Sequence, residues 1–223
     1  MSADRRDFLG SLFAAGLVPG MLGSRGSSNS EPLNPVPQNS WDVSWTNRIT
    51  GKHRAVFDTP EISMGLGLVR SLIWVKDYGE VYGAKPAEMS PVVVLRHNAI
   101  WLIMNDEFWA HHKVGELNKI MDPSTKAPIR RNPVIGANPF GLPPLADDSL
   151  KGALAAGTVL ACNLAFQLDV VAYLTSEEKL DAAKAREMAL AHVVPGVLLQ
   201  PSGIFSVLRA SEAGCHYFLA SEA

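Results

Sequence analysis

Residues 91–95 read Pro-Val-Val-Val-Leu, and this run decides the fold class. A short, continuous β-branched segment is typical of a strand buried on both faces of a parallel sheet. Working outward from it, the residue pattern predicts four more short strands, at 53–58, 158–162, 196–200 and 215–219. Helical patterns separate these strands. The alternation predicts an α/β fold, with a doubly wound, mostly parallel sheet and helices on both of its faces.

The predicted helices follow from apolar spacing and from capping residues. Pro60 opens the first one, which runs to about Trp74, and the second covers 99–115. Residues 175–178 read Thr-Ser-Glu-Glu, a capping-box pattern that predicts a helix beginning there and running toward His192. Two more helices are predicted, one at 149–156 and one that follows the turn at 201–203 and ends at Gly214.

The first forty residues have the pattern of an export signal followed by a flexible linker. Residues 4–9 read Asp-Arg-Arg-Asp-Phe-Leu, which matches a twin-arginine export signal. The apolar stretch behind it, 9–22, is about fourteen residues long, whereas a bilayer-spanning helix needs about twenty. We therefore predict a signal segment at 1–23, a Ser/Pro-rich linker at 24–40 and one folded domain at 41–223. An amphipathic membrane anchor is the alternative for the signal, and export to the periplasm is the expected location.

One long irregular segment interrupts the domain. Residues 122–148 contain six prolines, at positions 123, 128, 133, 139, 143 and 144. A loop of this length in a compact domain usually serves as a lid or an interface arm. We expect this insertion to lie over the carboxyl end of the sheet or against a neighbouring subunit.

Composition excludes several classes of function. The formal net charge is -2 and the pI is about 6.3, so no basic field favours nucleic acid. The sequence has no glycine-rich dinucleotide fingerprint, phosphate-binding loop or nucleophile elbow. We therefore expect no cofactor, and the sequence leaves open whether the protein is an enzyme.

In doubly wound folds, ligands bind outside the carboxyl ends of the strands. Two groups of residues are predicted to lie at that edge, one after the strand at 91–95 and one after the strand at 196–200. These candidate ligand-binding residues are Arg96, His97, Asn98, Ser202 and Gly203. They could hold a small anion. Alternatively, Arg96 pairs with Asp58 or Asp106 and only orders the edge.

Cys162 ends another of the predicted strands and is the candidate reactive residue. A helix beginning directly after it would place its N-terminal amides beside the sulfur and favour a thiolate. The alternative is an inert thiol in the core, because free cysteines are among the most buried residues. The second cysteine, Cys215, forms no metal-binding spacing with Cys162, and a single disulfide between them stays open.

The histidines are weaker candidates for a functional site than Cys162. His111 and His112 follow Asp106 closely, but adjacent residues on a helix point about 100° apart, which makes shared coordination of one ion difficult. No zinc-binding motif surrounds them. We expect solvated histidines and no metal site.

Two stretches resemble one known family. Residues 152–163 read Gly-Ala-Leu-Ala-Ala-Gly-Thr-Val-Leu-Ala-Cys-Asn, and residues 194–204 read Val-Pro-Gly-Val-Leu-Leu-Gln-Pro-Ser-Gly-Ile. Together they resemble the DsrE-like family of sulfur-handling proteins, over roughly residues 53–220. The resemblance implies a doubly wound α/β fold, assembly into homotrimers or hexamers, and a persulfide carried on Cys162. The export signal and the insertion at 122–148 depart from the family pattern.

Two functions follow as expectations. The first is an exported, oligomeric sulfur carrier that acts through Cys162 and meets a sulfur donor or acceptor protein. The second is a cysteine-independent binding or structural module whose pocket lies near Arg96 and His97.

Overall fold

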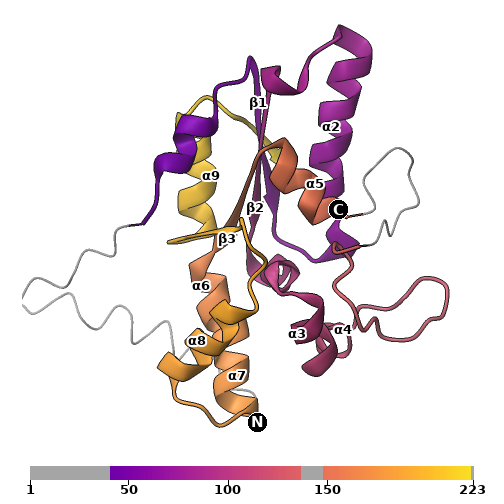
Figure 1. Cartoon of the computed structure of the whole chain (residues 1–223), viewed down its shortest axis with the longest axis vertical. Coiled ribbons are helices and arrows are strands. Elements are labelled where there is room, and N and C mark those ends of the chain that lie inside the picture. Colours follow the sequence, from indigo (N-terminus) through magenta and orange to yellow (C-terminus); the bar gives the residue numbers. More distant parts are fainter. Residues whose placement is uncertain (1–40, 137–147, 222–223) are drawn as a thin grey trace, which may run out of the picture. The chain divides into compact units, whose positions relative to one another are not determined.

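The computed structural model describes residues 41–136 and 148–221 (Figure 1). The predicted export signal and linker, and residues 137–147 of the predicted insertion, lie outside the described residues. Residues Ser40–Ala223 form one compact unit.

An open sheet of five parallel strands forms the centre of the described chain, in the order β4-β3-β2-β1-β5 (Figure 1). The pairing is in register along the sheet, so that Phe57 lies between Val93 on one side and Phe218 on the other. Every residue of β2 is buried, as the valine run predicts. The predicted doubly wound α/β class is thus confirmed. The strands are β1 (His53–Thr59), β2 (Met89–Leu95), β3 (Thr158–Cys162), β4 (Leu198–Gln200) and β5 (His216–Leu219).

Helices cover both faces of this sheet. On one face, α9 (Gly203–Glu212) and the short η1 (Ser44–Arg48) bury a cluster that includes Trp45, Val56 and Val94. On the other, α2 (Leu66–Tyr82) and α5 (Ser149–Ala156) pack over Phe57 and Val93. Alternate side chains of each strand point to opposite faces, which accounts for the two clusters.

The order of the strands creates a topological switch point, where the connections from two adjacent strands run to opposite faces of the sheet. The chain lays down β1 to β4 side by side, and α9 then returns across the opposite face to place β5 beside β1 (Figure 1). The connections that leave β3 and β4 therefore diverge, and ligands in such folds bind at the carboxyl ends of diverging strands. Cys162 ends β3, and Ser202 follows β4.

The segment after β2 differs from the single helix predicted at 99–115. It divides into a 3-10 helix, η4 (His97–Ile103), and two short helices, α3 (Asp106–His111) and α4 (Val114–Leu117). Asn105 causes the first break, because its side chain accepts from the amide of Phe108 and caps α3 at 2.9 Å. Lys113, with a φ of 49°, causes the second.

The segment after β3 also corrects a prediction. A helix begins directly after Cys162 as α6 (Asn163–Ala165), continues through the π-helical η5 (Phe166–Val171) and ends as α7 (Ala172–Glu177). Thr175 therefore lies inside a helix, where its hydroxyl donates to the carbonyl of Val171 over 2.9 Å. The next helix, α8 (Ala182–Ala191), is capped by Asp181, whose carboxylate accepts from the amide of Lys184.

Two boundaries shift for backbone reasons. The helix predicted from Pro60 begins only at Leu66, because the residues before it form the 3-10 turn η2 (Ser63–Gly65), with φ values of 33°, 51° and 82°. The strand predicted from Gly196 begins at Leu198, since Gly196 has a φ of 95° and belongs to a turn. A further 3-10 turn, η3 (Pro86–Glu88), leads into β2.

The described part of the predicted insertion, 122–136, contains no helix or named strand. Asn132 fixes it to the fold: this residue is fully buried, and its side-chain amide donates to the carbonyls of Leu102 and Met104 over 2.8 and 2.7 Å. This part of the insertion is therefore attached to η4, the segment that leaves the carboxyl end of β2.

Candidate functional site

Three side chains meet at the carboxyl ends of β1, β2 and β5. Asp58 of β1 is 3% exposed, and Arg96 donates to its two carboxylate oxygens over 2.5 and 2.9 Å. Tyr217 of β5 donates its hydroxyl hydrogen to Asp58 over 3.0 Å. The hydrogen bond to Asp58 raises the pKa of Arg96, against the opposing effect of burial. Of the two partners considered for Arg96, the structure selects Asp58.

Arg96 nevertheless keeps donors for a ligand. A guanidinium has five N–H groups, and Asp58 takes two of them. The side chain is 23% exposed, so its remaining donors are not sealed in the core. The two exposed residues that follow, His97 and Asn98, begin η4 beside it.

The turn between β4 and α9 packs against the side chain of Arg96. A Cβ built on Gly203 would lie 2.6 Å from Cδ and 2.7 Å from Cβ of Arg96, so only glycine allows this approach. Ser202 caps α9, its hydroxyl oxygen accepting from the amide of Phe205 at 3.1 Å. The structure thus brings Arg96 and Gly203 into contact, as the shared edge of the sheet predicts.

Cys162 lies at the end of β3 with its sulfur turned to the following helix. Its Sγ accepts a hydrogen bond from the amide of Ala165 at 3.3 Å, so that the sulfur caps α6. The residue is 6% exposed. Arg96 lies close enough to Cys162 for an electrostatic interaction between the two side chains. The sulfur of Cys162 therefore has a backbone N–H donor and a guanidinium group as neighbours.

The structure adds Tyr217 to the residues expected at this edge, and it gives Asp58 a central place among them. Val56 and Asp58 point to the α9 face, and the parallel register sets Tyr217 opposite Val56. The sequence alone does not show which strand pairs with β1 on its open side, and this is the information that finding Tyr217 requires.

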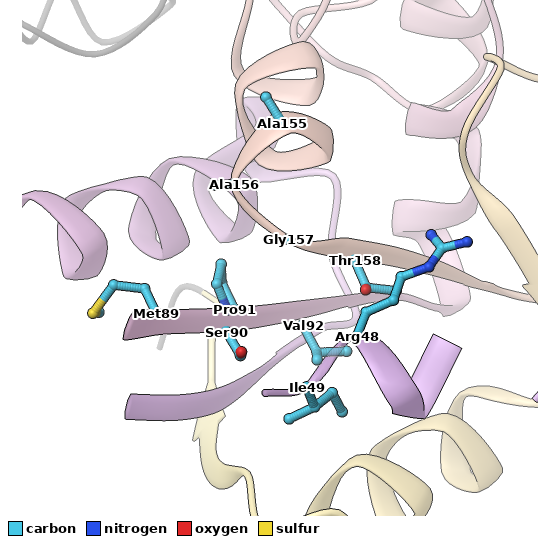
Figure 2. Close-up of a pocket in the computed structure, with 10 residues that line it drawn as sticks. All are labelled: Arg48, Ile49, Met89, Ser90, Pro91, Val92, Ala155, Ala156, Gly157 and Thr158. Carbon is cyan, nitrogen blue, oxygen red and sulfur yellow. The ribbon is translucent and has the colours of Figure 1, made fainter. Parts of the chain in front are cut away.

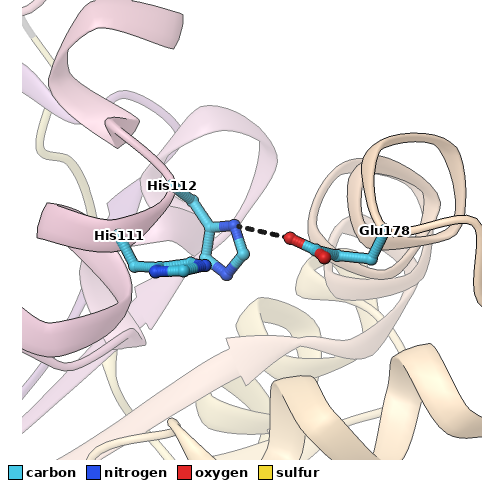
Figure 3. Close-up of side chains that lie close together, drawn as sticks. All are labelled: His111, His112 and Glu178. Carbon is cyan, nitrogen blue, oxygen red and sulfur yellow. Dashed lines mark ion pairs between the residues drawn. The ribbon is translucent and has the colours of Figure 1, made fainter.

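A second polar group lies away from the sheet edge, where α3, α7 and α8 meet. His111, His112 and Glu178 each offer a ligand atom, and these atoms lie within 4.8 Å of one another (Figure 3). Glu107 and His192 line the same pocket, whose volume is about 200 Å³. The helix ends at His111, so the expected divergence of the two rings does not occur: their centroids are 4.6 Å apart.

His112 is the buried member of this group. Its residue is 8% exposed, and its ring lies against Phe108 with the centroids 4.3 Å apart. Burial, together with the neighbouring His111, lowers its pKa, while Glu178, 3.8 Å from Nδ1, acts in the opposite direction. Glu178 is 66 positions further along the chain, and no local spacing in the sequence links it to the histidines.

Two other hollows do not coincide with the predicted site. A pocket of about 110 Å³ lies at the opposite, amino ends of β2 and β3, between η1 and the end of α5 (Figure 2). Backbone and apolar groups dominate its lining, and Arg48 is its one charged side chain among the described residues. A larger groove, about 440 Å³, runs along 122–133 beside Met64.

No family model, curated protein or solved structure matches this chain. Among the helices of residues 41–136 and 148–221, none is both long enough and apolar enough to cross a bilayer. What the site does must therefore be argued from its own geometry and from the two sequence motifs.

Proposed function

We propose that the protein is an exported, oligomeric sulfur carrier of the DsrE-like type, which holds a persulfide on Cys162. The observation that carries the proposal is the setting of the Cys162 sulfur, which accepts an amide N–H at 3.3 Å and lies near the Arg96 guanidinium. A sulfur relay needs a cysteine that can act as a nucleophile, and Cys162 ends β3 at the edge of the sheet where ligands bind in such folds. The twin-arginine motif supports export, although it lies outside the described residues.

The transfer is a thiol exchange that needs no external oxidant. The Cys162 thiolate attacks the outer sulfur of a donor persulfide, and the bond between the two donor sulfurs breaks. The donor leaves as a thiolate with that electron pair, while Cys162 keeps the outer sulfur as its own persulfide.

The burial of Cys162 limits the access of a donor to its sulfur. Cys162 is 6% exposed, so a donor reaches the sulfur only after a local movement where β3 passes into α6. We propose that the β3–α6 junction opens for transfer and closes over the persulfide afterwards, which protects it from water and from free thiols.

The test is the intact mass of the unreduced protein after incubation with a persulfide donor. The wild type and Cys215→Ser should both gain one sulfur, about 32 Da, while Cys162→Ser should gain none. Cys215 is a suitable control because burial raises the pKa of its thiol to about 11, which keeps it protonated and unreactive. An adduct that persists in Cys162→Ser would refute the proposal.

A second function is favoured by the free donors of Arg96. If the wild type gains no sulfur and assembles normally, we propose instead a small-anion site formed by Arg96 with Ser202, independent of the cysteine. Three further N–H groups of the guanidinium and its 23% exposure support this alternative. Arg96→Lys would then weaken anion binding, because lysine cannot contact both Asp58 and the ligand with a planar fork.

Assembly is the remaining part of the proposal. Ile204 and Leu208, one turn apart on α9, are 71% and 59% exposed. The neighbouring edge strand β5 exposes Tyr217, Phe218 and Leu219 to a similar degree. Apolar side chains gathered on one helix face beside an open sheet edge support an interface between copies of this chain.

A further inference from the structure

Three helix ends meet around the pocket of about 200 Å³ that lies away from the sheet edge. His112 is the C-cap of α3, Glu178 the C-cap of α7 and His192 the C-cap of α8. All three residues line this pocket. Helix C-termini carry partial negative charge from their free carbonyl groups, so the pocket is a place that favours a cation.

The side chains add to that charge. Glu107 and Glu178 both line the pocket, and its described lining contains neither lysine nor arginine. Lys113 and Lys179 directly follow His112 and Glu178 in the chain, but both are exposed and neither lines the pocket. A cation that enters the pocket therefore meets two carboxylates without a competing ammonium in the lining.

The donor atoms have the composition of a transition-metal site. Two imidazoles and one carboxylate are the ligands of many three-ligand zinc sites, in which the fourth position is held by water or substrate. Ligand atoms around a tetrahedral zinc lie about 3.4 Å apart, given bonds of about 2.0–2.1 Å. Here Nδ1 of His112 and Oε1 of Glu178 are 3.8 Å apart, and each of the three residues offers a ligand atom within 4.8 Å of the other two (Figure 3).

One ligand is fixed and two can adjust. His112 is packed between Phe108, with ring centroids 4.3 Å apart, and Tyr173, at 5.7 Å. His111 and Glu178 are exposed, so rotation about their side-chain torsions can shorten the distances without disturbing the core. A buried, pre-positioned imidazole with two mobile partners is suited to reversible metal binding.

We propose that this pocket binds one divalent transition-metal ion of the zinc class, through His111, His112 and Glu178. The fourth position faces the pocket and takes water or a small ligand. The bound ion joins α3 to the end of α7. The site does not use Cys162, and it holds whether or not the protein carries sulfur.

The test is binding of Zn²⁺ and Co²⁺ to the full chain prepared without a histidine tag. In competition with a chromophoric chelator, one Zn²⁺ should bind per chain, and His111→Ala and Glu178→Gln should each weaken binding by at least the roughly 10- to 100-fold that loss of an outer-shell partner costs. Both positions are exposed, so neither substitution endangers folding. Co²⁺ should give the visible absorption of a tetrahedral site, without the near-ultraviolet band of a thiolate ligand.

Two variants serve as controls. Glu177→Gln removes a neighbouring exposed carboxylate, and His216→Ala removes an exposed histidine on β5. Both should bind Zn²⁺ as the wild type does. The proposal fails if the wild type binds no stoichiometric Zn²⁺, if the ligand variants bind as tightly as the controls, or if the Co²⁺ spectrum shows thiolate ligation.

Discussion

Gly203 lies against the aliphatic part of Arg96, and this contact joins the start of α9 to the end of β2. We expect Gly203→Ala to destabilise the protein by about 1–3 kcal/mol, because the added methyl group must displace Arg96 from its pairing with Asp58. Urea denaturation followed by tryptophan fluorescence would measure the change.

The same substitution at a second glycine, Gly79, should change the stability in the opposite direction. Gly79 lies in α2, and a Cβ there would be 3.5 Å from the carbonyl oxygen of Ala84, which is an ordinary van der Waals contact. Gly79→Ala should therefore stabilise the protein by about 0.5–1 kcal/mol through helix propensity. If both variants changed stability equally, close packing at Gly203 would not be the cause.

The residues at the sheet edge show what the sequence could predict. Cys162, Arg96 and Gly203 could be placed there because each directly follows a segment with a clear strand pattern. The pairing of Arg96 with Asp58 could be foreseen only as one of two choices, since Asp106 lies nearer to Arg96 in the chain than Asp58 does. Tyr217 and Glu178 could not be found, because their partners depend on strand order and helix packing.

The helix boundaries after β3 lead to a prediction at the scale of elements. Asp181 caps α8 through the amide of Lys184 at 3.0 Å, and Asp181→Ala should cost about 0.5–2 kcal/mol. Thr175→Ala should change stability by less than about 0.5 kcal/mol, because a threonine that bonds back to the preceding turn adds little to a helix.

Thermal or urea unfolding of the two variants measures this contrast. The sequence pattern at 175–178 predicts the reverse order, with Thr175 as the costly cap. A larger loss for Thr175→Ala than for Asp181→Ala would therefore restore that helix start and contradict the boundaries described above.

Helices and strands could be predicted from the sequence where a clear apolar pattern marks them. All five strands and α5 lie where the sequence predicts them, and burial on both sides accounts for the clear apolar runs of β2 and β3. The edge strand β5 is exposed, and β4 begins two residues later than predicted. The segments 99–115 and 163–191 were harder, since their apolar spacing continues across breaks. Asn105, Lys113 and Asp181 decide those breaks through caps and positive φ angles, which apolar spacing does not record.

Assembly gives the prediction at the scale of the whole molecule. If α9 forms the interface, the wild type should be oligomeric by light scattering, and a double variant, Ile204→Glu with Leu208→Glu, should be monomeric. Val81→Glu is a matched control, because Val81 is 70% exposed on α2, away from this face. A monomeric wild type, or a double variant of unchanged mass, would contradict the proposed interface.

The hydrogen bond of Trp45 can form only late in the synthesis of the chain. Its indole N–H donates to Gln200 over 3.1 Å, and the Gln200 amide returns to the carbonyl of Asp42 over 2.9 Å. The first turn among the described residues is thus held by a residue made 155 positions later. During synthesis this tryptophan stays without its partner until the ribosome has released β4, and β1 waits longer still for β5. The described sheet is completed only once β5 has emerged, so a chain cut short before β4 leaves Trp45 without its hydrogen-bond partner.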